Sequence, residues 1–127
     1  MRPALLLLLP ALVPAMMVAA PTASAQRGAE QRCGWLSNPT PGNYWLRDRQ
    51  GEWLLSSQGG YAARGIDNMP DMTTRGWVET NGHYGYGCAC MSVQTDRRNG
   101  RVTRLFSARP VPLAQCRRDR SLPRRPD

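Results

Sequence analysis

The sequence predicts an all-β domain, a small disulfide-stapled sandwich or partly open barrel that is loop-rich and built of short antiparallel strands. Glycine and proline recur through the middle of the chain and leave few windows long enough for a helix. Several short runs with strand character are separated by turn signals. Four cysteines in a chain of 127 residues indicate two disulfides, as in small exported domains.

The start of the chain has the pattern of a secretory signal peptide over residues 1–25. Arg2 supplies the positive charge, an apolar stretch begins with Leu5 to Leu9, and Ala23-Ser24-Ala25 is a cleavage site of small residues. An uncleaved membrane anchor is the alternative, but prolines interrupt the stretch. Cys33 does not follow the small-residue pair that a lipoprotein requires. We therefore expect a periplasmic or secreted protein that is not membrane-spanning after cleavage.

Charge divides the mature chain into one domain over residues 26–116 and a disordered basic tail over residues 117–127. From Arg97 to Asp127 ten arginines stand against two acids, whereas the preceding part is nearly neutral. The basic third favours anionic partners such as lipid headgroups or acidic polymers, although a solvated tail that only aids solubility explains it too. Nucleic acid is not expected as a partner, because an exported chain without a binding motif has little access to it.

The spacing of the cysteines disfavours one pairing and leaves two better options open. On an extended strand the Cα atoms of Cys88 and Cys90 lie about 6.6 Å apart, so a bond between them would be strained. Pairs 33–88 with 90–116 and 33–90 with 88–116 both remain, because the loop-closure entropies are nearly equal. A zinc site would need paired C-x(2–4)-C spacing, and a redox-active Cys88–Cys90 would exploit the strain. Structural disulfides of Cys33, Cys88, Cys90 and Cys116 fit the pattern best.

In the first half of the domain the sequence predicts one hairpin. Residues 26–32 are polar and expected to fray, after which Cys33-Gly34-Trp35 ties the chain down. The prolines of Asn38 to Asn43 force an extended or turned path. Tyr44 to Asp48 predicts a strand and Glu52 to Ser56 the returning strand, joined by a type I turn. The hairpin is nearly continuously apolar, which predicts either cover on both faces or an aromatic side left available.

A loop and three strands are expected in the second half. Tyr61 to Asp71 lacks periodicity and contains glycine and proline, so it predicts a loop. Arg75 to Thr80 predicts a short strand, and Asn81-Gly82 a hairpin turn in which both residues accept positive φ. His83 to Asp96 predicts the next strand. Arg101 to Ala108 is its expected partner, ended by the prolines that follow.

The stretch from Thr80 to Cys90 is the expected centre of the domain. On an ideal strand its two tyrosines and two cysteines share one face, so the crosslinks and rings are expected in one layer. Gly85 and Gly87 fall on the opposite face together with Ala89, Met91 and Val93. Because the two glycines have no side chain, another backbone or a ring is expected to lie closely against them.

Aromatic content is the best indication of a function. Four Trp and four Tyr stand against one Phe, a bias toward rings with a polar end that suit interfaces and sugar-stacking surfaces. Most of these rings are expected to serve as core, but so small a domain cannot bury all eight. The residues expected to bind a ligand are Trp45, Tyr61, Tyr84 and Tyr86.

Several motifs together resemble an uncharacterised family of small exported bacterial proteins, domain of unknown function 4087. They are Cys33-Gly34-Trp35, Asn38 to Pro41, Gly51-Glu52-Trp53 with Gln58-Gly59, and Asn81-Gly82 leading into Tyr84 to Cys90. The resemblance covers about Cys33 to Leu122. It implies an exported, cysteine-linked domain and brings no activity, ligand or catalytic residue with it.

A search for catalytic or metal-binding patterns finds little. His83 is the only histidine and the weak candidate for a catalytic residue, with a loop acid as its partner. Asp67, Asp71 and Glu79 are the candidates for a hydrolytic carboxylate pair. No nucleophile elbow, phosphate loop, dinucleotide fingerprint or calcium loop is present, so we expect neither a cofactor nor a metal.

Three functions are therefore considered. The first is a non-enzymatic binding module that uses an aromatic face to hold an envelope protein, a glycan or an anionic lipid. The alternatives are a small periplasmic hydrolase and a structural or stress-related envelope protein without a specific ligand. A concave pocket lined by Trp45, Tyr61 or Tyr84 would favour the first function over the last.

Overall fold

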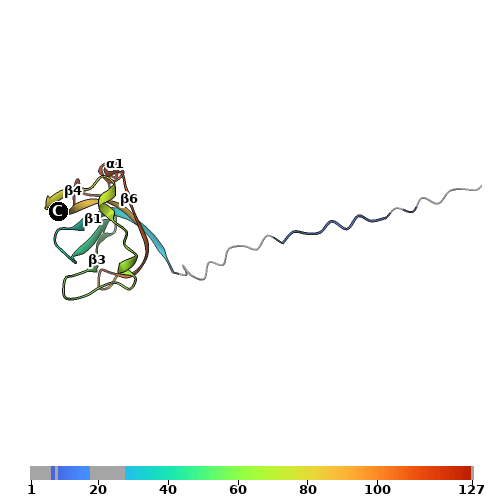
Figure 1. Ribbon diagram of the computed structural model, residues 1–127, viewed down its shortest axis with the longest axis horizontal. Helices are drawn as coiled ribbons and strands as arrows, with labels where there is room; N and C mark the ends of the chain where they lie inside the picture. The colour runs from blue at the N-terminus through green and yellow to red at the C-terminus, as the bar shows by residue number, and fades with distance from the viewer. Residues whose placement is uncertain (1–6, 8, 18–27, 127) are drawn as a thin grey trace, which may run out of the picture.

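A ring of hydrogen-bonded strands forms the body of the protein, as the all-β prediction requires (Figure 1). The computed structural model describes residue 7, residues 9–17 and residues 28–126. The strands are β1 (Glu30–Asn38), β2 (Tyr44–Asp48), β3 (Gly51–Ser56), β4 (Val78–Asn81), β5 (Tyr84–Asp96) and β6 (Arg101–Val111). Two 3₁₀ helices, η2 (Ile66–Asn68) and η3 (Met72–Thr74), lie between β3 and β4, and helix α1 (Leu113–Arg118) follows β6.

The strand order closes the sheet into a barrel and not a sandwich. The sheet runs β1-β2-β3-β6-β5-β4, and an additional pairing of β1 with β5 completes a ring of five strands. Among the described strands, β3 and β6 form the one parallel pair, joined at Leu54 and Arg101. The ring is therefore weakest at this seam, where Arg64 also exchanges backbone hydrogen bonds with β6. This circular order is that of the partly open, five-stranded Greek-key barrel known as the OB-fold.

Strand β1 was not predicted, because its barrel-facing positions hide the alternation. Leu36 faces the interior, but the other inward positions are Gly34 and Arg32, which is 6% exposed. The polar residues at the start of β1 and the glycine thus make the strand hard to recognise in the sequence, although it pairs with β5 over nine positions. A Cβ atom on Gly34 would collide with the backbone of Arg47 in β2, so this glycine lets the two strands approach.

The barrel interior holds the larger of two apolar clusters. All five strands of the ring contribute to it, and the loop between β3 and β4 closes one end. Its buried members are Leu36, Leu46, Trp53, Leu55, Ala63, Met72, Ala89, Met91, Val93, Val102 and Leu105.

A second, smaller cluster lies outside the barrel wall, on the other face of β5. Trp35, Cys88, Cys90, Val111 and Cys116 are its buried members, with further side chains from α1 and the C-terminal tail packed against it. The predicted faces of β5 are therefore confirmed, since the cysteines belong to the outer cluster and the alternate residues to the interior. Cover on both faces explains why β5 is buried almost throughout its middle.

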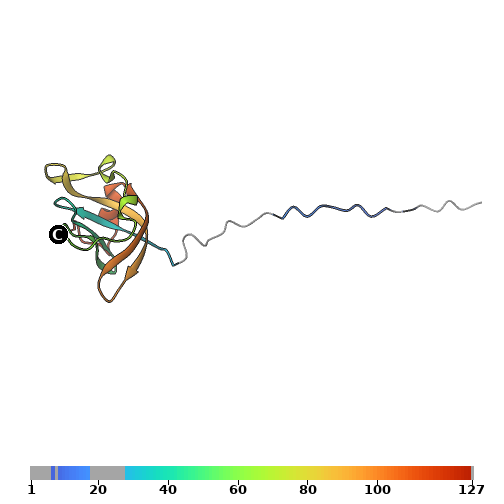
Figure 2. The same ribbon diagram turned by 60° about the horizontal axis from the view of Figure 1, so that its bottom comes forward.

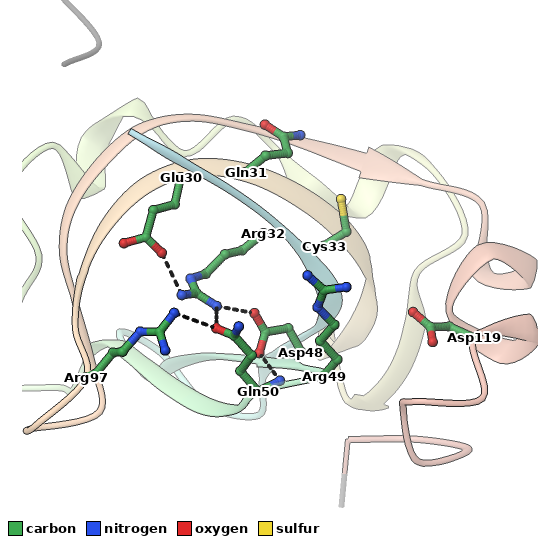
Figure 3. A pocket seen from close by; sticks show the side chains of 9 residues that line it. All are labelled: Glu30, Gln31, Arg32, Cys33, Asp48, Arg49, Gln50, Arg97 and Asp119. Carbon is green, nitrogen blue, oxygen red and sulfur yellow. Dashed lines mark hydrogen bonds and ion pairs between the residues drawn. The ribbon is translucent and has the colours of Figure 1, made fainter. Parts of the chain in front are cut away.

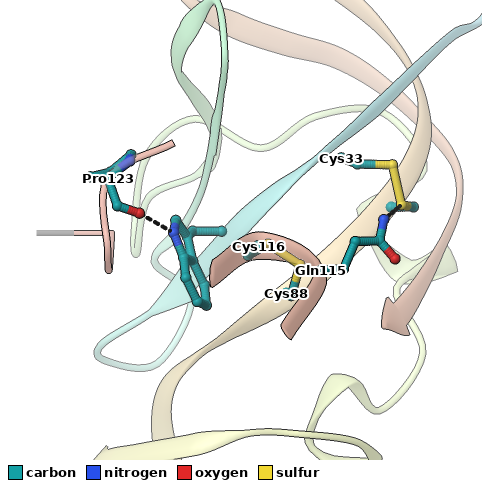
Figure 4. Close-up of a disulfide and its surroundings, with 7 residues drawn as sticks. Cys33, Cys88, Gln115, Cys116 and Pro123 are labelled. Atoms are coloured by element: carbon teal, nitrogen blue, oxygen red, sulfur yellow. Dashed lines mark hydrogen bonds between the residues drawn. A yellow bond between two sulfur atoms is a disulfide. The ribbon is translucent and has the colours of Figure 1, made fainter. Parts of the chain in front are cut away.

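The disulfides join Cys33 to Cys90 and Cys88 to Cys116, which decides between the two pairings left open. Cys33 and Cys90 are opposite each other in the β1–β5 ladder. Cys88 and Cys116 connect β5 to helix α1, which lies across the outer face of the sheet (Figure 4). Gln115 of the same helix donates a hydrogen bond to the Cys90 sulfur at 3.5 Å.

The glycines at the start of β5 accept close neighbours, as predicted. A Cβ atom on Gly87 would lie 2.9 Å from the Trp77 ring, and one on Gly85 would collide with the Val78 carbonyl. This packing holds the β4–β5 hairpin at one end of the molecule, with the β5–β6 turn at the other (Figure 2). The hairpin loop is Gly82–His83, one residue later than predicted, and only Gly82 has positive φ.

The C-terminal tail differs from the disordered segment that we expected over residues 117–127. Helix α1 extends to Arg118, and Leu122 packs against the outer cluster. The backbone carbonyl of Pro123 accepts a hydrogen bond from the Trp35 indole at 2.8 Å (Figure 4). Leu122 and the hydrogen bond from the buried Trp35 indole thus give residues 119–126 a place on the domain that charge alone did not predict.

The remaining strand ends differ little from the predictions. Strand β6 continues to Val111 and includes Pro110, whose missing N–H is tolerated because β3 does not reach that end of β6. Residues 1–6, 8 and 18–27, with most of the predicted signal peptide and its cleavage site, lie outside the described residues. Among the residues that the structure describes, no helix has the length and apolar character to cross a membrane.

Candidate binding groove

The outer face of the barrel carries a groove whose shape follows from strand register. Ser37 in β1 is paired with Tyr86 of β5 on one side and with Trp45 of β2 on the other. All three side chains point away from the interior, so a small serine lies between two aromatic rings. In the neighbouring row Trp35 is paired with Arg47, and Arg47 with Glu52 of β3. The groove therefore has aromatic walls in the row of Ser37, and the charged side chains of Arg47 and Glu52 in the next row.

The resulting pocket has a volume of about 350 Å³. It is lined by residues of five strands, of the turn after β1 and of the C-terminal tail. Its lining is Trp35, Ser37, Pro39, Trp45, Arg47, Glu52, Thr80, Gly85, Tyr86 and Pro126. A pocket of this size with apolar walls and a few polar groups has the composition of a ligand site.

Contacts within the domain hold the groove in shape. The rings of Trp35 and Tyr86 meet edge to face, with centroids 5.5 Å apart and planes at 85°. The buried Asn38 amide donates to the carbonyls of Thr40 and Asn43 and so fixes the turn at one end of the groove. Tyr86 also lies two residues from the disulfide-bonded Cys88, so this wall stands on a covalently braced strand, whereas β2 with Trp45 is held by its pairing with β1.

Two of the four predicted binding residues, Trp45 and Tyr86, come together in this groove, and all four are half-buried. Tyr61 lies elsewhere, where its hydroxyl donates to the Val102 carbonyl at 2.7 Å and Arg101 stands 4.5 Å over its ring. Tyr84 is outside the groove lining and close to Tyr44. Burial raises the pKa of the Tyr44 phenol, and the nearby Tyr84 and Asp71 raise it further.

The weak catalytic candidate, His83, lies at the tip of the β4–β5 hairpin with 97% of its side chain exposed. Its Nδ1 atom is 3.8 Å from a Glu79 carboxylate oxygen, and this acid is also exposed. Asp71 accepts hydrogen bonds from the hydroxyl and the backbone N–H of Thr73, which lower the pKa of its carboxyl. The histidine and the candidate acids Asp67, Asp71 and Glu79 therefore all lie at exposed surface positions.

A second pocket, also of about 350 Å³, opens at the barrel end near the start of β1 (Figure 3). At its centre the Arg32 guanidinium donates to Asp48 at 2.7 Å, to Gln50 at 2.8 Å and to Glu30 at 2.6 Å. Arg32 also stacks on Trp53, 4.1 Å from the ring centroid. The charged groups at the pocket floor are thus already engaged with one another.

Sequence reasoning did not identify Ser37, Arg47 and Glu52, nor the tail residue Pro126, as neighbours of the predicted aromatic face. The sequence pattern that could have identified them is the alternation along β2 and β3. In β2, for example, the outward residues Trp45 and Arg47 alternate with buried residues. Placing them beside Tyr86 requires the β1 register, and β1 itself was missed.

The part of the chain described by the structure holds no cluster of three or more His, Cys, Asp or Glu residues suited to a metal ion. No curated protein and no solved structure matches the chain. The model of one protein family matches residues 27–123, which include every described strand, both disulfides and all residues of the groove lining except Pro126. The chain is thus a member of the family described as protein of unknown function (DUF4087).

Proposed function

We propose that the protein is a non-enzymatic binding module of the cell envelope that holds an extended segment of a partner protein in the aromatic groove. The observation that carries this proposal is the half-open pocket between Trp45 and Tyr86, with Ser37 as its floor. Aromatic side chains with polar ends are typical of the energetically important centre of protein interfaces.

The groove is a better ligand site than the pocket at the barrel end. In the latter a ligand would have to compete with the hydrogen bonds between Arg32 and its three acceptors. Removing or displacing one partner of a buried ion pair costs about 3–5 kcal/mol of stability in other proteins. Trp45 needs no such exchange, because a ligand covering it removes apolar surface from water.

Rigidity supports a binding role as well. The Tyr86 wall belongs to β5, which is crosslinked to β1 and α1, and the Trp45 wall belongs to β2, which pairs with β1, so little conformational entropy is lost when a ligand binds. Both disulfides also fit an oxidising compartment such as the periplasm or the exterior, which is where we propose that the protein acts. The groove lies on the outer face of β1, between β5 and β2, and reaches β3 at Glu52, and fold alone does not assign its ligand.

The test is a titration of the oxidised protein with three classes of probe. The probes are peptides selected from a random extended library, soluble peptidoglycan strands and vesicles of phosphatidylglycerol. We expect selected peptides to bind and Trp45→Ala to weaken them at least about tenfold, since an interface hot spot contributes 1.4 kcal/mol or more, about the value of one decade.

Tyr61→Ala is the matched control, because Tyr61 is an equally half-buried ring outside the groove. It should leave the affinity unchanged. If only glycan strands or only vesicles bind, the partner is a glycan or an anionic lipid and not a protein segment. Equal affinities of the wild type and Trp45→Ala for every probe would contradict the groove as the binding site.

A further inference from the structure

The C-terminal tail occupies one end of the groove in the structure. Pro126 is part of the groove lining. Three residues earlier, the Pro123 carbonyl accepts the hydrogen bond from the fully buried Trp35. Leu122 packs on the outer cluster next to the same indole. These contacts place a segment with two prolines beside the aromatic walls.

We infer that the groove recognises a proline-containing segment and that residues 123–126 of the chain are its resident ligand, which a partner segment must displace. This inference rests on the proposed function and names the chemical class of its ligand. The tail sequence Pro123-Arg124-Arg125-Pro126 has the P-x-x-P spacing of proline-rich recognition segments.

The chemistry of proline fits what the groove offers. Proline has a flat apolar ring and no backbone N–H, so on burial only its carbonyl needs a hydrogen-bond partner. Aromatic grooves accept such rings, and an indole N–H supplies the donor, as Trp35 does for Pro123. Arg124 and Arg125 are exposed, as is the Pro123 ring, so this segment contacts the groove through the half-buried Pro126 and through the Pro123 carbonyl.

The tail leaves room for a larger ligand. Its backbone bends at Arg124 and Arg125, and the pocket of about 350 Å³ remains open toward Trp45 with the tail in place. A straighter segment would follow the row from Tyr86 to Trp45 and cover more aromatic surface than the tail does. A tethered tail acts at an effective concentration of about 1 mM or more, so a partner segment must bind tightly enough to compete with it.

The experiment uses the oxidised chain lacking residues 123–127 and a synthetic peptide of residues 120–127 as the probe. We expect calorimetry to show binding of the peptide to the shortened chain and at least about tenfold weaker binding to the full chain, because the tethered tail competes. Trp45→Ala in the shortened chain should reduce the affinity. A peptide with both prolines replaced by alanine should bind at least about tenfold more weakly.

A second variant covers the case in which the shortened chain does not fold. Trp35→Phe in the full chain keeps a ring and removes the indole N–H, so the tail should be released more often. Trypsin should then cleave after Arg124 faster than in the wild type, and the peptide should bind more tightly than to the wild type. Unchanged cleavage and unchanged peptide affinity would overturn the inference.

Two further results would also overturn it: a folded shortened chain that fails to bind the peptide, and equal binding of the alanine peptide. These failures are distinct from failure of the proposed function. If library peptides without proline bind in a Trp45-dependent manner, the groove remains a binding site and only the ligand class is wrong. If no probe depends on Trp45, the proposed function itself fails.

Discussion

At the scale of single residues, the most consequential contact lies at the open end of the barrel. Arg32 and Asp48 are 6% and 5% exposed and form an ion pair of 2.7 Å. The other oxygen of Asp48 accepts hydrogen bonds from the backbone of Gln50 and from the indole of Trp53. One carboxylate thus connects β1, the β2–β3 turn and the interior, and its partner charge, the Arg32 guanidinium, is buried.

Removing this carboxylate should cost far more than removing an exposed one. Asp48→Ala leaves the Arg32 guanidinium buried with fewer acceptors, so we expect a loss of about 3–5 kcal/mol in the free energy of unfolding. The double variant Arg32→Met/Asp48→Leu should lose less, since no charge remains buried. Asp67→Ala, at an exposed loop position, is the control and should change stability by less than about 0.5 kcal/mol. Urea denaturation measures all three, and a double variant less stable than Asp48→Ala would contradict this account.

Glu30 makes stability depend on pH. Burial raises the pKa of its carboxyl, but hydrogen bonds from Thr95 and Arg32 and the charges of Arg32 and Arg97 outweigh burial, so the pKa lies below its ordinary value. A carboxyl with a lowered pKa in the folded state stabilises the protein above its unfolded pKa and loses this contribution as the pH falls through the folded value. The stability advantage of the wild type over Glu30→Gln should therefore be constant near neutral pH and shrink below about pH 5. An advantage that grows on acidification would refute the assignment.

At the scale of elements, β5 could be predicted from sequence and β1 could not. In β5 the alternation of glycines with tyrosines and cysteines marks two faces, and the structure places one in the barrel and the other in the outer cluster. In β1 the inward positions carry Arg32 and Gly34, which have no apolar signature. A buried arginine is recognisable only when its acceptors are known, and two of them, Asp48 and Gln50, come from the end of β2 and the turn after it.

The contact between Gly87 and Trp77 holds the β4–β5 hairpin against the barrel. An alanine at position 87 would place its Cβ 2.9 Å from the Trp77 ring, so the ring or the hairpin must move. We expect Gly87→Ala to cost about 1–3 kcal/mol and to change the environment of the tryptophan. Gly82→Asn in the same hairpin is the matched control, because asparagine tolerates the positive φ of that turn. Thermal melts followed by fluorescence would measure both, and equal melting temperatures would contradict the packing argument.

At the scale of the whole molecule, the two disulfides have different tasks. Cys33–Cys90 closes a separation of 57 residues between strands that are already paired, whereas Cys88–Cys116 closes 28 residues and holds α1. The loop-closure model assigns each bond about 4 kcal/mol. Both contributions are large for a small domain, whose total stability is about 5–15 kcal/mol.

Removing each bond separately should reveal this division. Replacing either pair of cysteines with alanine should lower the melting temperature, because the unfolded chain gains entropy. Only the variant without Cys88–Cys116 should also release α1 and the tail, which trypsin detects as faster cleavage after Arg117 and Arg118. Equal cleavage rates in the two variants would contradict the assigned roles.

The sequence predicted which kind of residue forms the candidate groove, but not which segments of the chain line it. The bias toward Trp and Tyr indicated that some rings remain accessible, and Trp45 lies on the outward face of a strand whose interior position is Leu46. Tyr61 was grouped with it although a loop carries it to β6, where it contacts Val102 and Arg101. Such neighbours depend on barrel closure and on the position of the tail, which local patterns do not specify.

The most direct test of this account is peptide mapping of the purified, unreduced protein under non-reducing conditions. The groove, the outer cluster and the docked tail all depend on β5 being joined to β1 through Cys33–Cys90 and to α1 through Cys88–Cys116. Mass spectrometry of the digest should recover these two linked peptide pairs and no free thiol. Recovery of Cys33 with Cys88 and of Cys90 with Cys116, or of four unpaired cysteines, would contradict it.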